Sequence, residues 1–133
     1  MTAVSHRWPT VVALTLAALT FLDGLPGPKV LAPVLASMPL FYLAFGAFRG
    51  ELRRPGVLAG QLVGLAGFAA LALCAVAVDG TVALVVLAVG WLGHAAWDLV
   101  HHLRDRVVPR AWSEWCGVFD ACGALALLLA AAA

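Results

Sequence analysis

The stretch "TVALVVLAVGWLGHAAWDLVHHLRDR", residues 81–106, decides the fold because it combines two opposed properties. Its first half is almost entirely apolar, whereas its second half holds three of the four histidines of the chain. A membrane-spanning helix needs about 20 mostly apolar residues, and this stretch is long enough for one. Ionisable side chains in such a helix face other helices or a watery cavity, because hydrocarbon does not tolerate them. The stretch therefore predicts one helix of a membrane bundle with a polar interior.

The composition of the whole chain supports this interpretation. Of the 133 residues, 64% are hydrophobic and 11% are charged, whereas soluble domains usually have about 25% charged residues. The formal net charge is +1, which indicates neither a nucleic-acid-binding protein nor one that binds acidic substrates. We therefore expect a single transmembrane domain, residues 1–133, with membrane lipid as a partner and no nucleic acid.

Apolar segments alternate with short turns along the chain. They predict an all-α integral membrane bundle of five transmembrane helices over residues 8–25, 29–48, 55–78, 81–103 and 111–131. The string "DGLPGPK" and the pair Asp79-Gly80 mark turns that end two of these helices. We expect kinks at Pro33 and Pro39. We also expect the first segment to be an anchor and not a cleaved signal peptide, because no small-residue cleavage site precedes its turn.

The basic residues predict the orientation of the bundle. With five alternating spans, all eight of them except Lys29 fall on one side: Arg7, Arg49, Arg53, Arg54, Arg104, Arg106 and Arg110. Loops rich in Lys and Arg stay in the cytoplasm. We therefore expect a multi-pass protein of the plasma (inner) membrane with its N-terminus in the cytoplasm and its C-terminus outside.

The polar residues of the opening stretch fall on one face of the expected helix. At about 100° per residue, they form a stripe that consists of His94, Asp98, His101 and Asp105. Trp91 and Trp97 flank this stripe, and His102 lies just outside it. The stripe predicts a polar interior in the cytoplasmic half of the bundle.

Other segments place polar residues at a similar depth. Asp120 shares a face of the last segment with small residues, among them Cys116, which lets that face pack closely on another helix. Tyr42 and Gln61 lie in the second and third segments. We predict that Tyr42, Gln61, Asp98, His101 and Asp120 converge, with His94 nearer the midplane. Gly56, Gly60 and Gly64 form a repeated G-x-x-x-G pattern, which predicts a second close-packing face.

Each polar residue also has a structural interpretation. His94 and Gln61 are typical interhelical hydrogen-bonding groups. His102 and Asp105 lie near the interface, where contact with lipid headgroups is as reasonable as a role in a site. Asp98 could form an ion pair with Arg104 or Arg106. A carboxylate at this depth nevertheless costs about 3 kcal/mol on insertion scales, which favours a functional role for Asp98 and Asp120.

Metal binding is the first chemistry that these residues allow. Asp98 is spaced to share an ion with His101 at i, i+3 or with His102 at i, i+4. Asp120 or His94 could supply a further ligand. Mixed nitrogen and oxygen ligands suit a divalent metal such as zinc, iron or manganese. The predicted metal ligands are Asp98, His101, His102 and Asp120.

Acid–base catalysis is the second chemistry, and it makes the protein a small membrane enzyme. The predicted catalytic residues are Asp98, His101, Asp120 and His94, because a buried carboxyl group and an imidazole can exchange a proton. The predicted pocket is lined by Trp91, Trp97, Tyr42, Gln61 and Cys116. Such a pocket suits a hydrophobic, isoprenoid or lipid-like small molecule and an isomerase, cyclase or hydrolase reaction.

Transport is the alternative function, since chains of intramembrane His and Asp mark proton and ion pathways. Five short spans form a thin bundle, so a transporter or channel of this kind would be a homo-oligomer. Haem binding is a weaker option, because His94 and His101 lie on one helix and a second helix or chain must supply the opposing ligand.

The strings "HAAWDLVHH" and "VVPRAWSEWCGVFDACG" resemble small bacterial multi-pass integral membrane proteins of unknown function with an H-x-x-W-D-x-x-H-H motif. The resemblance covers residues 94–123. It implies a membrane location and no particular activity.

Overall fold

The computed structural model describes residues 7–133, which form α-helices and one short 3-10 helix, with no strand in that range. The α-helices are α2 (Trp8–Phe21), α3 (Pro28–Phe48), α4 (Val57–Ala77), α5 (Gly80–Arg104) and α6 (Arg110–Ala132), and the 3-10 helix η1 covers Glu51–Arg53. The all-α prediction is confirmed. α3, α4, α5 and α6 are each long and apolar enough to cross a membrane, and they lie close to the predicted segments.

α2 is shorter than the predicted first span, since it ends at Phe21 and not at residue 25. Its 14 residues extend over about 21 Å at 1.5 Å per residue. The helix stops because Gly24 adopts a φ of +138°, and because Pro26 has no N–H with which to continue the ladder of hydrogen bonds. α2 packs mainly against α6, and the ring of its last residue, Phe21, also meets Trp91 of α5.

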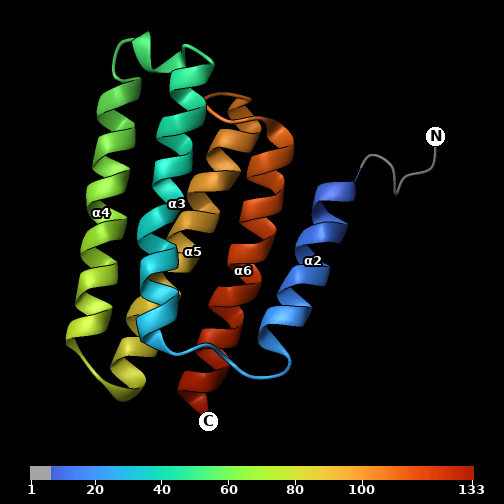
Figure 1. Cartoon of the computed structure of the whole chain (residues 1–133), viewed down its shortest axis with the longest axis vertical. Coiled ribbons are helices and arrows are strands. Elements are labelled where there is room, and N and C mark those ends of the chain that lie inside the picture. The colour runs from blue at the N-terminus through green and yellow to red at the C-terminus, as the bar shows by residue number, and fades with distance from the viewer. Residues whose placement is uncertain (1–6) are drawn as a thin grey trace.

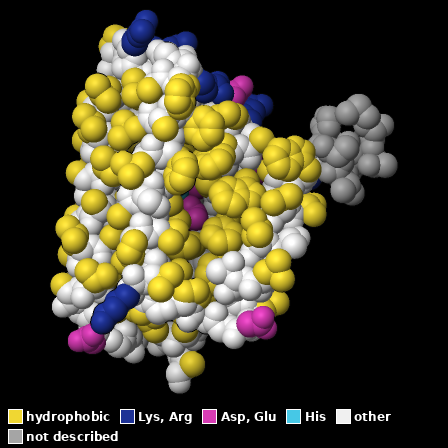
Figure 2. Space-filling view, viewed as in Figure 1, with side chains coloured by type: hydrophobic (Ala, Val, Ile, Leu, Met, Phe, Trp, Pro, Cys, Tyr) yellow, Lys and Arg dark blue, Asp and Glu magenta, His cyan; other side chains and the backbone are white. Residues whose placement is uncertain are grey.

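The helices run alternately up and down, as Figure 1 shows, and α5 lies at the centre of the packing. α5 contacts α3, α4 and α6, whereas α4 and α6 do not contact each other and therefore flank α5. In Figure 2 the Lys and Arg side chains gather at the end that carries the α3–α4 and α5–α6 loops, apart from one patch at the opposite end. The predicted orientation rests on this clustering of basic residues at one end of the bundle.

Polar and apolar side chains are distributed as a lipid environment requires. Large apolar residues face outward; Phe48 is 90% exposed and Leu19 is 70% exposed. The buried polar residues are Gln61, His94, Asp98, His101, Ser113 and Asp120. Soluble proteins rarely bury ionisable groups while exposing broad apolar surfaces. The described residues therefore combine an apolar exterior with a small group of buried polar side chains, as expected for a membrane bundle.

Small residues set how closely the helices approach. A Cβ atom on Gly117 of α6 would lie 3.2 Å from the Cβ of Asp98, so α5 and α6 meet closely at the depth of the polar residues. The predicted face of Gly56, Gly60 and Gly64 is different. Gly56 precedes α4 with a φ of +78°, and a Cβ on Gly60 would meet no atom within 4 Å. Only Gly64 makes a close contact, with the indole of Trp97, since Gly56 lies before the helix begins and Gly60 faces no neighbouring element.

Candidate functional site

The centre of the candidate site is a group of three buried side chains, His94 and Asp98 from α5 and Asp120 from α6. Nδ1 of His94 lies 2.8 Å from Oδ2 of Asp120 and 3.3 Å from Oδ2 of Asp98. His94 and Asp98 are fully buried, and Asp120 is 2% exposed. The one-turn spacing of His94 and Asp98 places both on the face of α5 that meets the small residues of α6. We call these three residues the His–Asp centre.

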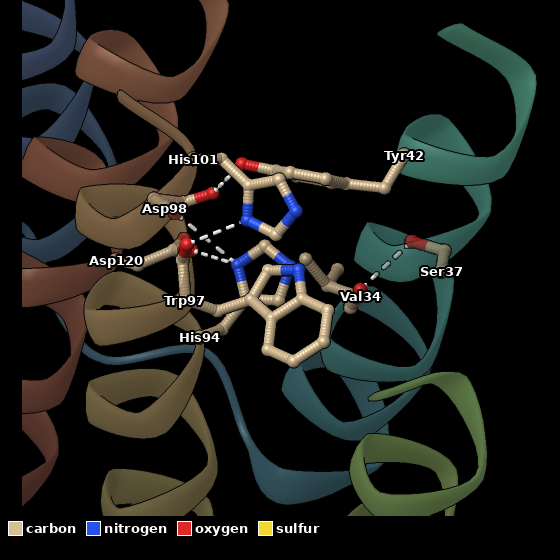
Figure 3. Close-up of polar contacts among 8 residues, drawn as sticks. All are labelled: Val34, Ser37, Tyr42, His94, Trp97, Asp98, His101 and Asp120. Carbon is tan, nitrogen blue, oxygen red and sulfur yellow. Dashed lines mark hydrogen bonds and ion pairs between the residues drawn. The ribbon is translucent and has the colours of Figure 1, made fainter. Parts of the chain in front are cut away.

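The two nitrogens of His94 have different environments. Nδ1 donates its hydrogen to Asp120, because a carboxylate can only accept. Nε2, on the other side of the ring, is buried and has no hydrogen-bond partner. Figure 3 shows dashed lines from one nitrogen of the His94 ring to the carboxylates. The carboxylates thus hold one end of the imidazole and leave the other end free.

Tyr42 of α3 completes the polar contacts of the His–Asp centre. Its hydroxyl donates a hydrogen bond to Oδ1 of Asp98 (Figure 3). Its ring also meets the ring of His94 edge-on, at a centroid distance of 5.7 Å. Phe68 of α4 packs on His94 in a similar way, at 5.0 Å. Residues from all four long helices therefore fix the position of this imidazole.

The His–Asp centre has more acids than bases. Within residues 7–133, His94 is the only ion-pair partner of Asp98 and of Asp120. If both carboxyl groups are ionised, one imidazolium neutralises only one of them, and an uncompensated buried charge is costly. The side chain of Asp120 keeps 3% of its surface exposed. Figure 2 shows an acidic side chain at the base of a small opening between α3 and α6.

His101 and Gln61 form a neighbouring polar layer. Nδ1 of His101 donates to the carbonyl of Trp97 at 2.8 Å, so this nitrogen carries the hydrogen. Nε2 of the neutral ring then accepts from the Gln61 amide nitrogen at 3.0 Å. The ring of His101 packs against that of Tyr42 at 4.8 Å. Both nitrogens of His101 are therefore occupied, unlike those of His94.

The residues predicted to line the pocket are not all in one place. Trp97 is partly exposed and packs against His101 at 5.1 Å. Trp91 lies in the apolar core, against Phe21 and Phe119. Cys116 is buried in α6 as a free thiol. Of the predicted aromatic pair, only Trp97 contacts the polar layer.

His102 and Asp105 lie apart from the His–Asp centre, in contrast to the prediction. Nδ1 of His102 donates to the carbonyl of Arg110 at 3.2 Å. Asp105 leaves the predicted stripe because it ends α5 in a left-handed conformation, with a φ of +49°. Its carboxylate lies 3.8 Å from Nε of Arg110. The alternative ion pair between Asp98 and Arg104 or Arg106 does not form, since Asp98 faces His94 and Tyr42.

The donor atoms of the His–Asp centre could share a metal ion, since they lie within 4.8 Å of one another. One imidazole nitrogen and two carboxylate oxygens form a set that suits zinc, iron or manganese. This set contains His94 in place of the predicted His101 and His102. An ion coordinated by Nδ1 of His94 would replace the hydrogen on that atom, so a metal and a proton compete for the same position.

Sequence reasoning missed Phe68. It follows Gln61 by seven residues, about two helical turns, and thus lies on the same face of α4. That spacing could have identified the residue, but an apolar residue in an apolar helix gives no signal that distinguishes it from the core.

Comparison of the chain with protein-family models, with curated proteins and with solved structures found no match. Its function is therefore inferred from the geometry of its own residues. The resemblance of residues 94–123 to small membrane proteins stays a prediction.

Proposed function

We propose that the protein is a small integral membrane enzyme that transfers protons on a lipid-soluble substrate, with His94 as the catalytic base. The observation that carries this proposal is the asymmetry of His94. Two buried carboxylates face Nδ1, while Nε2 is buried without a partner. Holding one imidazole nitrogen with a carboxylate fixes the tautomer in which the other nitrogen accepts a proton.

The proposed reaction moves a proton within one substrate. Nε2 of His94 removes a proton from one atom of the substrate, the imidazolium exchanges protons with water through the slightly exposed Asp120, and a proton is then returned to another atom of the substrate, so that no co-reactant is needed. The imidazolium is favourable because Asp98 and Asp120 supply negative charge at Nδ1. Tyr42 is a positioning residue, since it holds the carboxylate of Asp98. This chemistry is that of an isomerase.

The proposed setting is the plasma (inner) membrane, with five spans and a cytoplasmic N-terminus. It is supported by four helices of membrane-spanning length and by the basic residues gathered at one end of the bundle. In this placement α2 is the fifth, short span. The apolar exterior would keep bulk water away from most of the surface around His94, which suits a substrate that dissolves in lipid.

Hydrogen exchange in D₂O tests this proposal without knowledge of the substrate. Proteoliposomes are incubated in D₂O with a bacterial membrane lipid extract, and the lipids are analysed by mass spectrometry. We expect one lipid species to gain deuterium with the wild-type protein and with His102→Gln, and to gain none with His94→Gln. Deuterium uptake that is equal for His94→Gln and the wild type, or absent from both, would overturn the proposal.

In a second form of this proposal, the enzyme binds a divalent metal ion at the His–Asp centre. It is supported by the three converging donor atoms, and the ion would supply Lewis-acid chemistry when bound. Metal analysis of the detergent-purified protein tests it. A near-stoichiometric metal that is lost in both His94→Gln and Asp120→Asn would support this form. A metal content that neither substitution changes would contradict it.

Proton or ion transport by a homo-oligomer is the alternative function. It is favoured by the excess of negative charge at the His–Asp centre, which a mobile cation could neutralise. Dye-loaded proteoliposomes under a pH gradient test it. Transport predicts proton flux with the wild-type protein and none with Asp120→Asn, whereas the enzyme predicts no flux from either.

A further inference from the structure

The free nitrogen of His94 lies on the side of the ring away from Asp120, and Phe68 of α4, which packs on this ring, borders a groove on the outside of the bundle. Nδ1 is directed to Asp120 on α6, and α4 and α6 flank α5 on different sides. Nε2, across the ring, therefore points away from α6 and toward α3 and α4 (Figure 3). On α4, the ring of Phe68 packs on the ring of His94 at a centroid distance of 5.0 Å.

The groove behind Phe68 runs between α4 and α5. Its volume is about 480 Å³, and its lining is almost wholly apolar. Among the residues that line this groove are Gly64, Gly67, Phe68 and Trp97, which decide whether a ligand can reach His94 from the groove. Phe68 lies between the groove and the imidazole, 5.0 Å from the ring of His94 and 6.1 Å from that of Trp97. Phe68 thus borders both the groove and the imidazole that carries the unpaired nitrogen.

We infer that this groove is the binding site and lateral entrance for an apolar molecule with one O–H or N–H group, and that Phe68 is its gate. The apolar body of the ligand fits the lining of the groove. Its single donor satisfies Nε2 of His94, which has no partner. As the route of a substrate, this inference rests on the proposed function. As a binding site for the ligand, it requires only that Nε2 of His94 is buried and unpaired.

Phe68 and not Trp97 is the movable side chain. The indole of Trp97 presses on Gly64, where a Cβ atom would lie 2.9 Å from the ring. A Cβ on Gly67, in contrast, would meet no atom within 4 Å, so there is open space beside Phe68 on α4. Rotation of the Phe68 side chain toward the groove would expose Nε2 without moving a helix.

Nitrogen NMR of histidine-labelled protein in nanodiscs tests the binding site. The probe is 4-decylphenol, whose hydroxyl can donate to Nε2, and the matched control is decylbenzene, which has no donor. The resonance of His94 is identified by its absence in His94→Gln. We expect decylphenol, and not decylbenzene, to shift the Nε2 signal of His94. No shift, or an equal shift with decylbenzene, would overturn the inference.

Two glycine substitutions on α4 test the route. Gly67→Phe fills the groove, whereas Gly60→Phe adds the same ring seven residues earlier on the same face of α4, outside the groove. Neither Cβ meets an atom within 4 Å, so both variants should fold. We expect Gly67→Phe to abolish the shift caused by decylphenol and Gly60→Phe to keep it. A shift that survives Gly67→Phe would exclude this route.

These outcomes separate the inference from the proposed function. Deuterium uptake that requires His94 but is unchanged in Gly67→Phe would reject the groove and leave the enzyme standing. Decylphenol binding without any deuterium uptake would reject the enzyme and leave the binding site. If the wild-type protein is a dimer that only Gly67→Phe dissociates, the groove is a subunit interface and the inference is wrong.

Discussion

Histidine and aspartate occur in two groups with opposite properties on and around the second half of α5. The His–Asp centre is buried and joins α5 to α6 through paired side chains. The second group, His102, Asp105 and Arg110, lies where α5 ends, and its ion pair is more than half exposed on both sides, at 58% and 57%. Water and counterions screen the exposed group and cannot screen the buried one. Residue type alone therefore does not identify a site; burial and the partner helix do.

The largest difference between the two groups should appear when histidine is removed. We expect His94→Ala to reduce the free energy of unfolding by about 3–5 kcal/mol, because two buried carboxylates lose their only ion-pair partner. Denaturation of the detergent-solubilised protein by SDS measures this change, with His102→Ala as the matched control. Equal losses in the two variants would contradict the comparison.

The excess of acids makes a second, less expected prediction. Asp98→Asn or Asp120→Asn alone should change the stability by less than about 1 kcal/mol, because one carboxylate remains to accept from His94. The double variant should lose about 2–3 kcal/mol, since no carboxylate then faces the imidazole. A double-mutant cycle in the same SDS assay measures the coupling. Additive changes would show that the two carboxylates do not share His94.

Tyr42→Phe tests how much the hydrogen bond from α3 contributes to the stability of the buried group. The substitution keeps the aromatic ring but removes the hydroxyl that donates to Asp98, so a buried acceptor loses its partner. We expect a loss of about 1–2 kcal/mol in the free energy of unfolding. Phe45→Leu, a change at a partly buried ring of the same helix, controls for packing. A smaller loss for Tyr42→Phe than for this control would mean that the hydroxyl contributes little.

The smallest effect belongs to the exposed group. We expect Asp105→Asn and His102→Gln each to change stability by less than about 0.5 kcal/mol, because the ion pair of Asp105 is exposed and the half-buried His102 makes only one long hydrogen bond, to the carbonyl of Arg110. Thermal unfolding followed by circular dichroism measures both variants. A loss above 1 kcal/mol at either position would place that residue in the structural core and remove the contrast with the His–Asp centre.

The helices could be predicted from the sequence where turn residues bound them sharply. Asp79 and Gly80 mark the boundary between α4 and α5, and Pro109 precedes α6. The apolar pattern predicts too long a first helix, because Leu22 and Leu25 continue this pattern after the backbone has left the helix. The hydrophobicity of the segment does not indicate that the chain turns at Gly24 and that the helix ends before it.

The candidate site could be predicted only within a single helix. A helical wheel places His94 and Asp98 on one face, and both lie in the centre. Whether Asp120 meets His94, and not His101 or His102, depends on how the α5–α6 loop sets the two helices side by side. That loop contains Asp105 and Val107, both in left-handed conformations that could not be predicted from the sequence.

The short length of α2 has a consequence for the surrounding bilayer. A hydrocarbon layer about 30 Å thick exceeds the 14 residues of this helix, which extend over about 21 Å. In the proposed placement, lipids beside α2 must compress, or the unwound residues 22–27 must cover the remaining depth. Such mismatch costs fractions of a kcal/mol per Å. The protein should therefore partition into thinner regions of a membrane, with α2 turned toward the thinnest lipid.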